Sequence, residues 1–240
     1  MLVLALVAAL VVISSHHRPT SVSTTIALPP GPVTTTSALT VDRGKVVFSD
    51  DFHDPGSGWV TTPSAVATFS YGDDDYMVSG SGSFYDQSYA PYSEPVTQVG
   101  ISTTATQSVG APVGAGFGVV CRQGSGQAEI LYEFLLVNNT KWVILRHDGL
   151  PATATLTLKE GTAPGSPGAT PNTVAGMCAT QPDGQTTRLA MFVDGVAVAD
   201  ITDSAALPGG GWVAGIGIAS IAATTSTVTA TQFTERNLDL

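Results

Sequence analysis

The sequence from Ala115 to Arg146 reads AGFGVVCRQGSGQAEILYEFLLVNNTKWVILR, and this stretch decides the fold class. It contains three runs rich in β-branched and aromatic residues, which are typical of strands. The runs cover residues 116–122, 128–137 and 141–146. Short polar turns separate them: QGSGQ at 123–127 supplies two glycines, and Asn138 with Asn139 tolerates a left-handed backbone. We therefore predict a three-stranded antiparallel meander.

The middle run divides its side chains between two faces, because successive residues of a strand point to opposite sides of the sheet. One face carries Ile130, Tyr132, Phe134 and Leu136. The other carries Glu129, Leu131, Glu133, Leu135 and Val137. The first face is apolar apart from one hydroxyl, so we place it in the core of a sandwich, and the second face is mixed.

The rest of the chain repeats short strand patterns bounded by Gly, Ser or Pro, and no long amphipathic helix interrupts them. Asp194-Gly195 is the strongest two-residue hairpin signal. Further strands are predicted at 46–48, 76–79, 83–88, 98–106, 152–159, 172–179, 187–193, 196–201, 212–220 and 226–233. With about 200 residues after the leader, we predict one all-β domain, a two-sheet antiparallel jelly-roll sandwich of roughly twelve to fourteen strands.

Composition supports this fold class and excludes some partners. Charged residues make up only 12% of the chain, which is few for the outer faces of a soluble helical protein. The formal net charge is -10. A chain of this sign repels a phosphate backbone and an anionic membrane surface, so we expect no nucleic-acid partner.

The N-terminus begins with thirteen uncharged apolar residues, Met1 to Ile13. A helix of this length covers about 20 Å, which is less than the ~30 Å hydrocarbon core of a bilayer. Two interpretations stay open: a short export signal, or a signal or anchor whose upstream part is missing. A buried core helix is disfavoured because a polar linker follows. We predict a short hydrophobic helix in 1–15, membrane contact through this segment alone, and an extracytoplasmic domain that is either anchored or secreted.

A linker follows this hydrophobic segment. Between Pro19 and Thr40, ten of 22 residues are Ser or Thr and four are Pro, so the segment cannot bury enough apolar surface to fold. We expect an extended stalk over 16–43, before a domain that covers 44–240.

Two cysteines, Cys121 and Cys178, lie in the middle of predicted strands that face the core. An even number of cysteines in an exported chain favours a disulfide. Two free buried thiols are the alternative.

Clusters of acidic residues invite a metal hypothesis, at 50–54 (DDFHD) and 73–75 (DDD). We interpret both as turns, because Phe52 interrupts the alternating oxygen ligands that a calcium loop requires. No metal site and no cofactor is predicted. Histidines are scattered, and no glycine-rich phosphate loop with lysine occurs.

Three tyrosines, Tyr85, Tyr89 and Tyr92, are candidates for stacking on a sugar ring, since a tyrosine has an apolar face and a polar rim. Packing at strand ends is the alternative.

Several segments together resemble a concanavalin A-like lectin/glucanase domain of jelly-roll type, as found on actinobacterial membrane-anchored or secreted surface proteins, some of them receptor-type kinases. The segments are 47–59, 116–122, 132–146, 172–178 and 189–200. This resemblance implies a two-sheet antiparallel sandwich whose first and last strands pair. It implies no activity by itself, because the fold carries lectins, hydrolases and inert modules.

Glucanases of this superfamily have the motif E-x-D-x-E on one strand, with two catalytic glutamates. Glu129 and Glu133 are similarly spaced, but Leu131 stands where the aspartate is expected. Nothing there separates the pKa values of the two carboxyl groups, which two-carboxylate hydrolysis requires. We therefore expect two solvated glutamates and no enzyme.

The sequence thus favours a non-catalytic extracellular module that binds carbohydrate or another cell-envelope component. One alternative is a structural, adhesion or sensor spacer with no small ligand. A second is a glycoside hydrolase of the laminarinase type.

Overall fold

The computed structural model describes residues 41–91, 95–108, 114–125, 128–149, 154–165, 171–204 and 210–238. Within these ranges all regular secondary structure is β-strand, as predicted. The strands are β1 (Lys45–Asp50), β2 (Ala67–Tyr71), β3 (Tyr76–Tyr89), β4 (Gln98–Gln107), β5 (Gly116–Ser125), β6 (Ala128–Val137), β7 (Lys141–Asp148), β8 (Ala154–Thr162), β9 (Asn172–Thr180), β10 (Thr187–Val193), β11 (Val196–Asp203) and β12 (Trp212–Asn237).

The predicted N-terminal helix and most of the predicted linker lie outside the described residues. In the part of the chain that is described, no helix has the length and apolar character needed to cross a bilayer.

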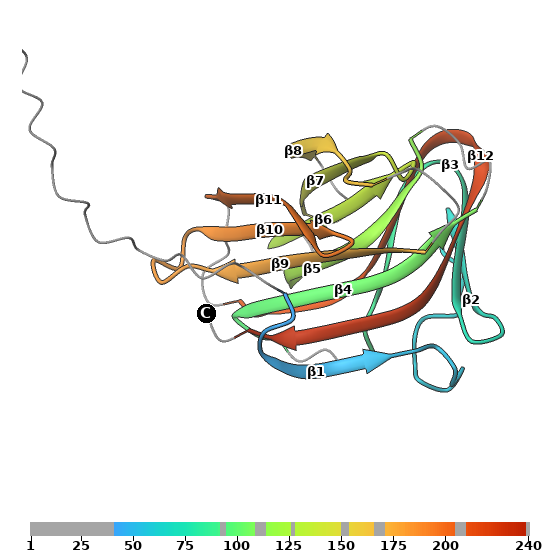
Figure 1. Cartoon of the computed structure of the whole chain (residues 1–240), viewed down its shortest axis with the longest axis horizontal. Coiled ribbons are helices and arrows are strands. Elements are labelled where there is room, and N and C mark those ends of the chain that lie inside the picture. Colours follow the sequence, from blue (N-terminus) through green and yellow to red (C-terminus); the bar gives the residue numbers. More distant parts are fainter. Residues whose placement is uncertain are drawn as a thin grey trace, which may run out of the picture. The chain divides into compact units, whose positions relative to one another are not determined.

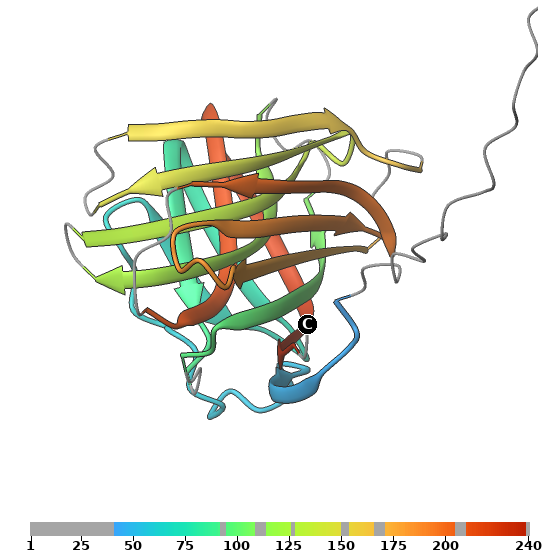
Figure 2. The same cartoon turned by 90° about the vertical axis from the view of Figure 1, so that its left-hand side faces the viewer.

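The strands form two antiparallel layers that share β12 (Figures 1 and 2). The first layer has the order β8-β7-β6-β5-β12-β3-β2, and the second has the order β11-β10-β9-β4-β12-β1. Residues 212–219 of β12 pair with β5, whereas residues 228–237 pair with β4. The two-sheet sandwich is therefore confirmed, and so is the pairing of the first strand with the last.

Two predicted strand breaks are wrong. Residues 76–89 form one strand, and so do residues 212–237, although each was expected to be two. Small residues near the expected breaks allow each strand to bend without ending, and Figure 1 shows the bend in β12. Strands β3 and β12 stay paired with each other on both sides of a register shift between Ala222 and Ser226. Strand β2 had not been predicted from the sequence.

The meander folds as its pattern indicates. The apolar face of β6 is buried in the core, with Tyr132 and Phe134 completely inaccessible to solvent. Asn138 and Asn139 have φ angles of 51° and 52°, so the turn uses the left-handed conformation expected of this pair. Asp194 and Gly195 form the turn between β10 and β11 and are also left-handed, with φ angles of 50° and 76°.

An aromatic cluster fills one part of the core. Its rings come from Phe48, Phe52, Trp59, Tyr76 and Phe233. The rings of Trp59 and Phe233 meet edge to face at 4.9 Å, an arrangement that stabilises aromatic pairs beyond their burial. Asp50 supports this cluster: its carboxylate accepts hydrogen bonds from the Phe52 amide at 2.8 Å and the Trp59 indole at 2.9 Å. The carboxylate of Asp50 thus holds the loop in place.

A disulfide joins the two layers through the core. Cys121 on β5 belongs to the first layer, Cys178 on β9 belongs to the second, and the two are bonded. Both residues are fully buried. The predicted pairing is confirmed.

Replacing both cysteines by alanine should destabilise the domain. The bond closes a loop of 57 residues, and the loss of this cross-link from the unfolded chain lowers the free energy of unfolding by about 4 kcal/mol in the chain-entropy model. Urea denaturation of the full chain and of the double variant Cys121→Ala, Cys178→Ala measures the difference. An unchanged midpoint would contradict a stabilising disulfide.

Candidate functional site

Polar side chains gather on the outer face of the first layer, which is the mixed face of the meander. On each strand these residues alternate with residues that point into the core. They are Tyr85 and Tyr89 on β3, Arg122 on β5, Glu129 and Glu133 on β6, and His147 on β7. We call this set the polar face.

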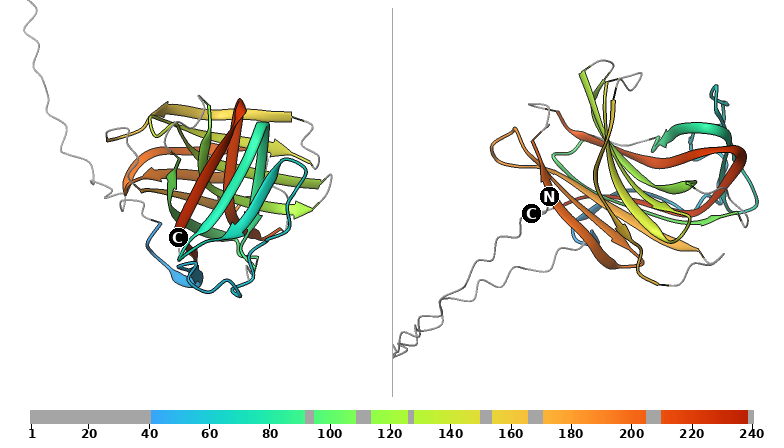
Figure 3. Two further views of the ribbon diagram at one scale, coloured as in Figure 1. Left: turned by 90° about the vertical axis from the view of Figure 1, so that its right-hand side faces the viewer. Right: turned by 90° about the horizontal axis from the view of Figure 1, so that it is seen from above.

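The first layer is strongly curved, so this face is concave. Tyr85 and His147 are separated by β12, β5 and β6 in the strand order. In a flat sheet four inter-strand spacings would put the two backbones about 19 Å apart. Their rings nevertheless meet edge to face, with centroids 5.2 Å apart. Figure 3 shows the steep crossing of β3 and β12 relative to β6, β7 and β8 that accompanies this curvature.

Glu133 contacts His147 and is completely inaccessible to solvent. Its Oε2 lies 3.1 Å from Nε2 of His147, and the other ring nitrogen of His147 lies 3.0 Å from the Thr155 hydroxyl. Among the described residues no group hydrogen-bonds Oε1 of Glu133. Half of this carboxyl group is therefore buried without a partner.

The surroundings raise the pKa of Glu133. Burial is the largest cause, because it disfavours the charged form, while the hydrogen bond and the charge of His147 act in the opposite direction. The nearby carboxylate of Asp86 raises the pKa further. Burial also raises the pKa of Tyr85, to which the charge of Glu133 adds. A carboxyl group with a shifted pKa and a specific partner in a concave face is typical of a functional site.

A second group of polar residues lies beside the first. The guanidinium carbon of Arg122 lies 3.9 Å from the centre of the Tyr89 ring, within the range of a cation–π interaction. Arg122 Nη1 also lies 3.9 Å from Oε2 of Glu129. Burial raises the pKa of Glu129, and the charge of Arg122 partly offsets this rise. Arg122 therefore holds an aromatic ring and a carboxylate in one row across the sheet.

Gly217 on β12 provides the floor of the face. A Cβ atom at this position would lie 2.7 Å from Cγ1 of Val120 and 3.6 Å from Oε1 of Glu133. Only glycine leaves this space, so the unpaired carboxylate oxygen reaches across to β12.

The structure corrects one expectation and extends others. Glu129 and Glu133 were expected to be solvated, but they are 4% and 0% exposed, because the curvature of the sheet covers them. Tyr85 and Tyr89 share the face with both glutamates, so the sequence candidates are brought together. Tyr92 lies outside the described residues.

Sequence reasoning missed Arg122 and His147. Both lie directly opposite Leu131 in the strand pairing, one on each side of β6. The turn lengths of the meander fix this register, so counting back from the two turns would have placed both residues beside the glutamates.

Replacing Glu133 by glutamine should remove a pH-dependent loss of stability. Below its ordinary pKa of 4.5 the group is protonated in both states, but as the pH rises the unfolded chain loses this proton first, since the folded pKa is raised. The stability of the native chain therefore falls as the pH rises through the folded pKa, and Glu133→Gln lacks this decrease. Urea denaturation midpoints across a pH series measure the stability of the native chain and of Glu133→Gln. The control is Glu160→Gln at an exposed position, which should keep the pH dependence of the native chain. Parallel profiles for the native chain and Glu133→Gln would contradict the raised pKa.

Comparison with solved structures identifies similar folds. The carbohydrate recognition domain of Emp46p is 8% identical, with a TM-score of 0.55 over 77% of this chain and 90% of that one. The kappa-carrageenase zobellia_236 from Zobellia galactanivorans is 10% identical, with a TM-score of 0.56 over 85% of this chain and 98% of that one. A GlcNAcα1-4Gal-releasing endo-β-galactosidase from Clostridium perfringens is 11% identical, with a TM-score of 0.56 over 88% and 66%. No protein-family model and no curated protein sequence matches the chain. At these identities the likeness concerns the fold alone, and it agrees with a concanavalin A-like sandwich.

Proposed function

We propose that the polar face binds a glycan without cleaving it. The observation that carries this proposal is the position of Tyr85. Tyr85 is 41% exposed, and its ring packs against His147, which in turn contacts the buried Glu133 at 3.1 Å.

This arrangement suits the chemistry of a sugar. A pyranose has an apolar C–H face, which stacks on an aromatic ring, and a rim of hydroxyl groups. Arg122, whose side chain is 30% exposed, can donate hydrogen bonds to these hydroxyls, and the hydroxyl of the exposed Tyr85 can both donate and accept. The solved structures of similar fold include a carbohydrate recognition domain, an endo-β-galactosidase and a kappa-carrageenase. This supports a carbohydrate ligand by analogy of fold.

Binding is favoured over hydrolysis by the state of the two carboxyl groups. Glu133 has no exposed surface and is engaged by His147, and Glu129 faces Arg122. Leu131 lies between them on β6 and is itself buried, so the strand position between the two glutamates carries no carboxylate. A two-carboxylate hydrolase needs an acid and a nucleophile or base that both reach the glycosidic bond.

The disulfide supports a location outside the cytoplasm, where thiols are oxidised. We infer that the N-terminal hydrophobic segment either anchors the chain in the membrane or directs its secretion. The ligand would then be a cell-envelope or extracellular glycan.

A glycan array tests the proposal with the full chain. We expect binding to a defined set of glycans, and Tyr85→Ala should weaken it by about ten-fold or more, because an aromatic ring at the centre of a contact contributes strongly. Val196→Ala is the control, since Val196 is 51% exposed and lies on β11 in the other layer.

Two results would contradict glycan binding. A folded chain that binds nothing on the array favours a spacer or adhesion module. Equal losses in Tyr85→Ala and in the control exclude the polar face as the binding site. Release of reducing ends from a bound glycan, abolished in Glu133→Gln, would instead establish the hydrolase alternative.

A further inference from the structure

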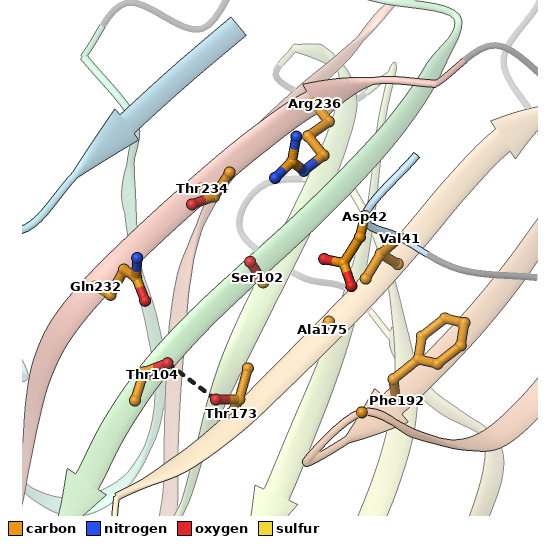
Figure 4. A pocket seen from close by; sticks show the side chains of 11 residues that line it. Val41, Asp42, Ser102, Thr104, Thr173, Ala175, Phe192, Gln232, Thr234 and Arg236 are labelled. Carbon is orange, nitrogen blue, oxygen red and sulfur yellow. Dashed lines mark hydrogen bonds between the residues drawn. The ribbon is translucent and has the colours of Figure 1, made fainter. Parts of the chain in front are cut away.

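A pocket of about 300 Å³ lies on the opposite side of the sandwich, on the outer face of the second layer (Figure 4). Its floor comes from neighbouring strands β9, β4 and β12. The floor residues are Thr173, Ala175, Ser102, Thr104, Gln232 and Thr234. This volume is at the lower end of the range for small-molecule sites.

The wall of the pocket is built where the chain enters the domain. Val41 and Asp42 pass over the sheet, and Val41 packs in a small apolar cluster with Leu238 and Phe192. Gly100 permits this close approach: a Cβ atom there would lie 3.1 Å from the Val41 carbonyl oxygen and 2.9 Å from Cδ2 of Leu238. The pocket is thus part of a packed structure, formed by the two ends of the domain.

One cationic side chain serves the pocket. Arg236 extends from β12, and Figure 4 shows its guanidinium group directed toward Ser102. Among the described residues Arg236 takes part in no ion pair, unlike Arg122, Arg146 and Arg188. A guanidinium group presents a planar fork of donors that matches a carboxylate.

The remaining polar atoms of the pocket are mainly neutral. The hydroxyls of Thr104 and Thr173 lie 2.9 Å apart and form a hydrogen bond with each other. Hydroxyl groups act as both donors and acceptors, and so does the amide of Gln232, so they match the hydroxyl groups of a sugar. Asp42 across the pocket can accept from a hydroxyl but repels a second negative charge.

We propose that this pocket binds an acidic saccharide of the uronic acid class. The single carboxylate of such a sugar pairs with Arg236, while its hydroxyl groups bond the row of Thr, Ser and Gln side chains. A neutral sugar leaves the guanidinium group without its partner, and a simple carboxylate leaves the hydroxyl row unused. The site is independent of the polar face, because it lies on the other layer.

Calorimetric titration of the full chain with glucuronate, glucose and acetate tests this assignment. We expect saturable binding of glucuronate, with glucose and acetate each at least about ten-fold weaker, as for ligands that each lack half of the hydrogen bonds. Arg236→Ala should reduce glucuronate affinity by about ten-fold or more. Arg43→Ala is the matched control: it removes the same charge from an exposed position that does not line the pocket.

Four outcomes decide between this proposal and its rivals. Undiminished glucuronate binding in Tyr85→Ala separates this site from the polar face and supports the proposal. Equal losses of glucuronate affinity in Arg236→Ala and Arg43→Ala would show a general effect of charge and overturn the proposal. Equal affinity for glucose and glucuronate would overturn the role of Arg236. An absence of saturable glucuronate binding would overturn the site itself, without bearing on glycan binding at the polar face.

Discussion

The shared strand β12 is the constraint on which the structure depends. Its first part pairs with β5 and β3 in one layer, and its last part pairs with β4 and β1 in the other. One continuous backbone therefore fixes the relative position of both layers, and the disulfide between β5 and β9 adds a second link through the core. The Gly and Thr residues of β12 suit this double role, because small or β-branched side chains leave room for a bend without ending the strand.

The curvature that follows from this arrangement creates the polar face. Because the first layer bends, side chains on distant strands meet above its centre, and Glu133 is enclosed by Tyr85 and His147 although it points away from the core. A buried carboxyl group with one unpaired oxygen is costly. Its other oxygen is the partner of Nε2 of the buried His147, so the two groups depend on each other.

The two layers differ in how their outer faces are used. On the first layer, ionisable and aromatic groups converge over a glycine floor at Gly217. On the second layer, neutral hydroxyl groups line a pocket whose wall is the entering chain at Val41 and Asp42. That pocket therefore lies at the point where the described chain begins. A ligand bound there would contact both the sheet and residues 41–42.

The sequence by itself determined the all-β class, the registers of the meander and the face of β6 that enters the core, because these depend on local alternation and turn chemistry. It favoured the pairing of Cys121 with Cys178 from the even number of cysteines, and the structure decided between this disulfide and two free thiols. The sequence also supplied Glu129, Glu133, Tyr85 and Tyr89 as separate candidates. Only the tertiary structure decided that β3 and β12 run unbroken through their bends and that the two glutamates are buried. It alone brought the ring of His147 into contact with that of Tyr85 and placed Val41, Asp42 and Arg236 around one pocket. These features depend on sheet curvature and on contacts between residues far apart in the chain, and a period of two along one strand contains no information about either.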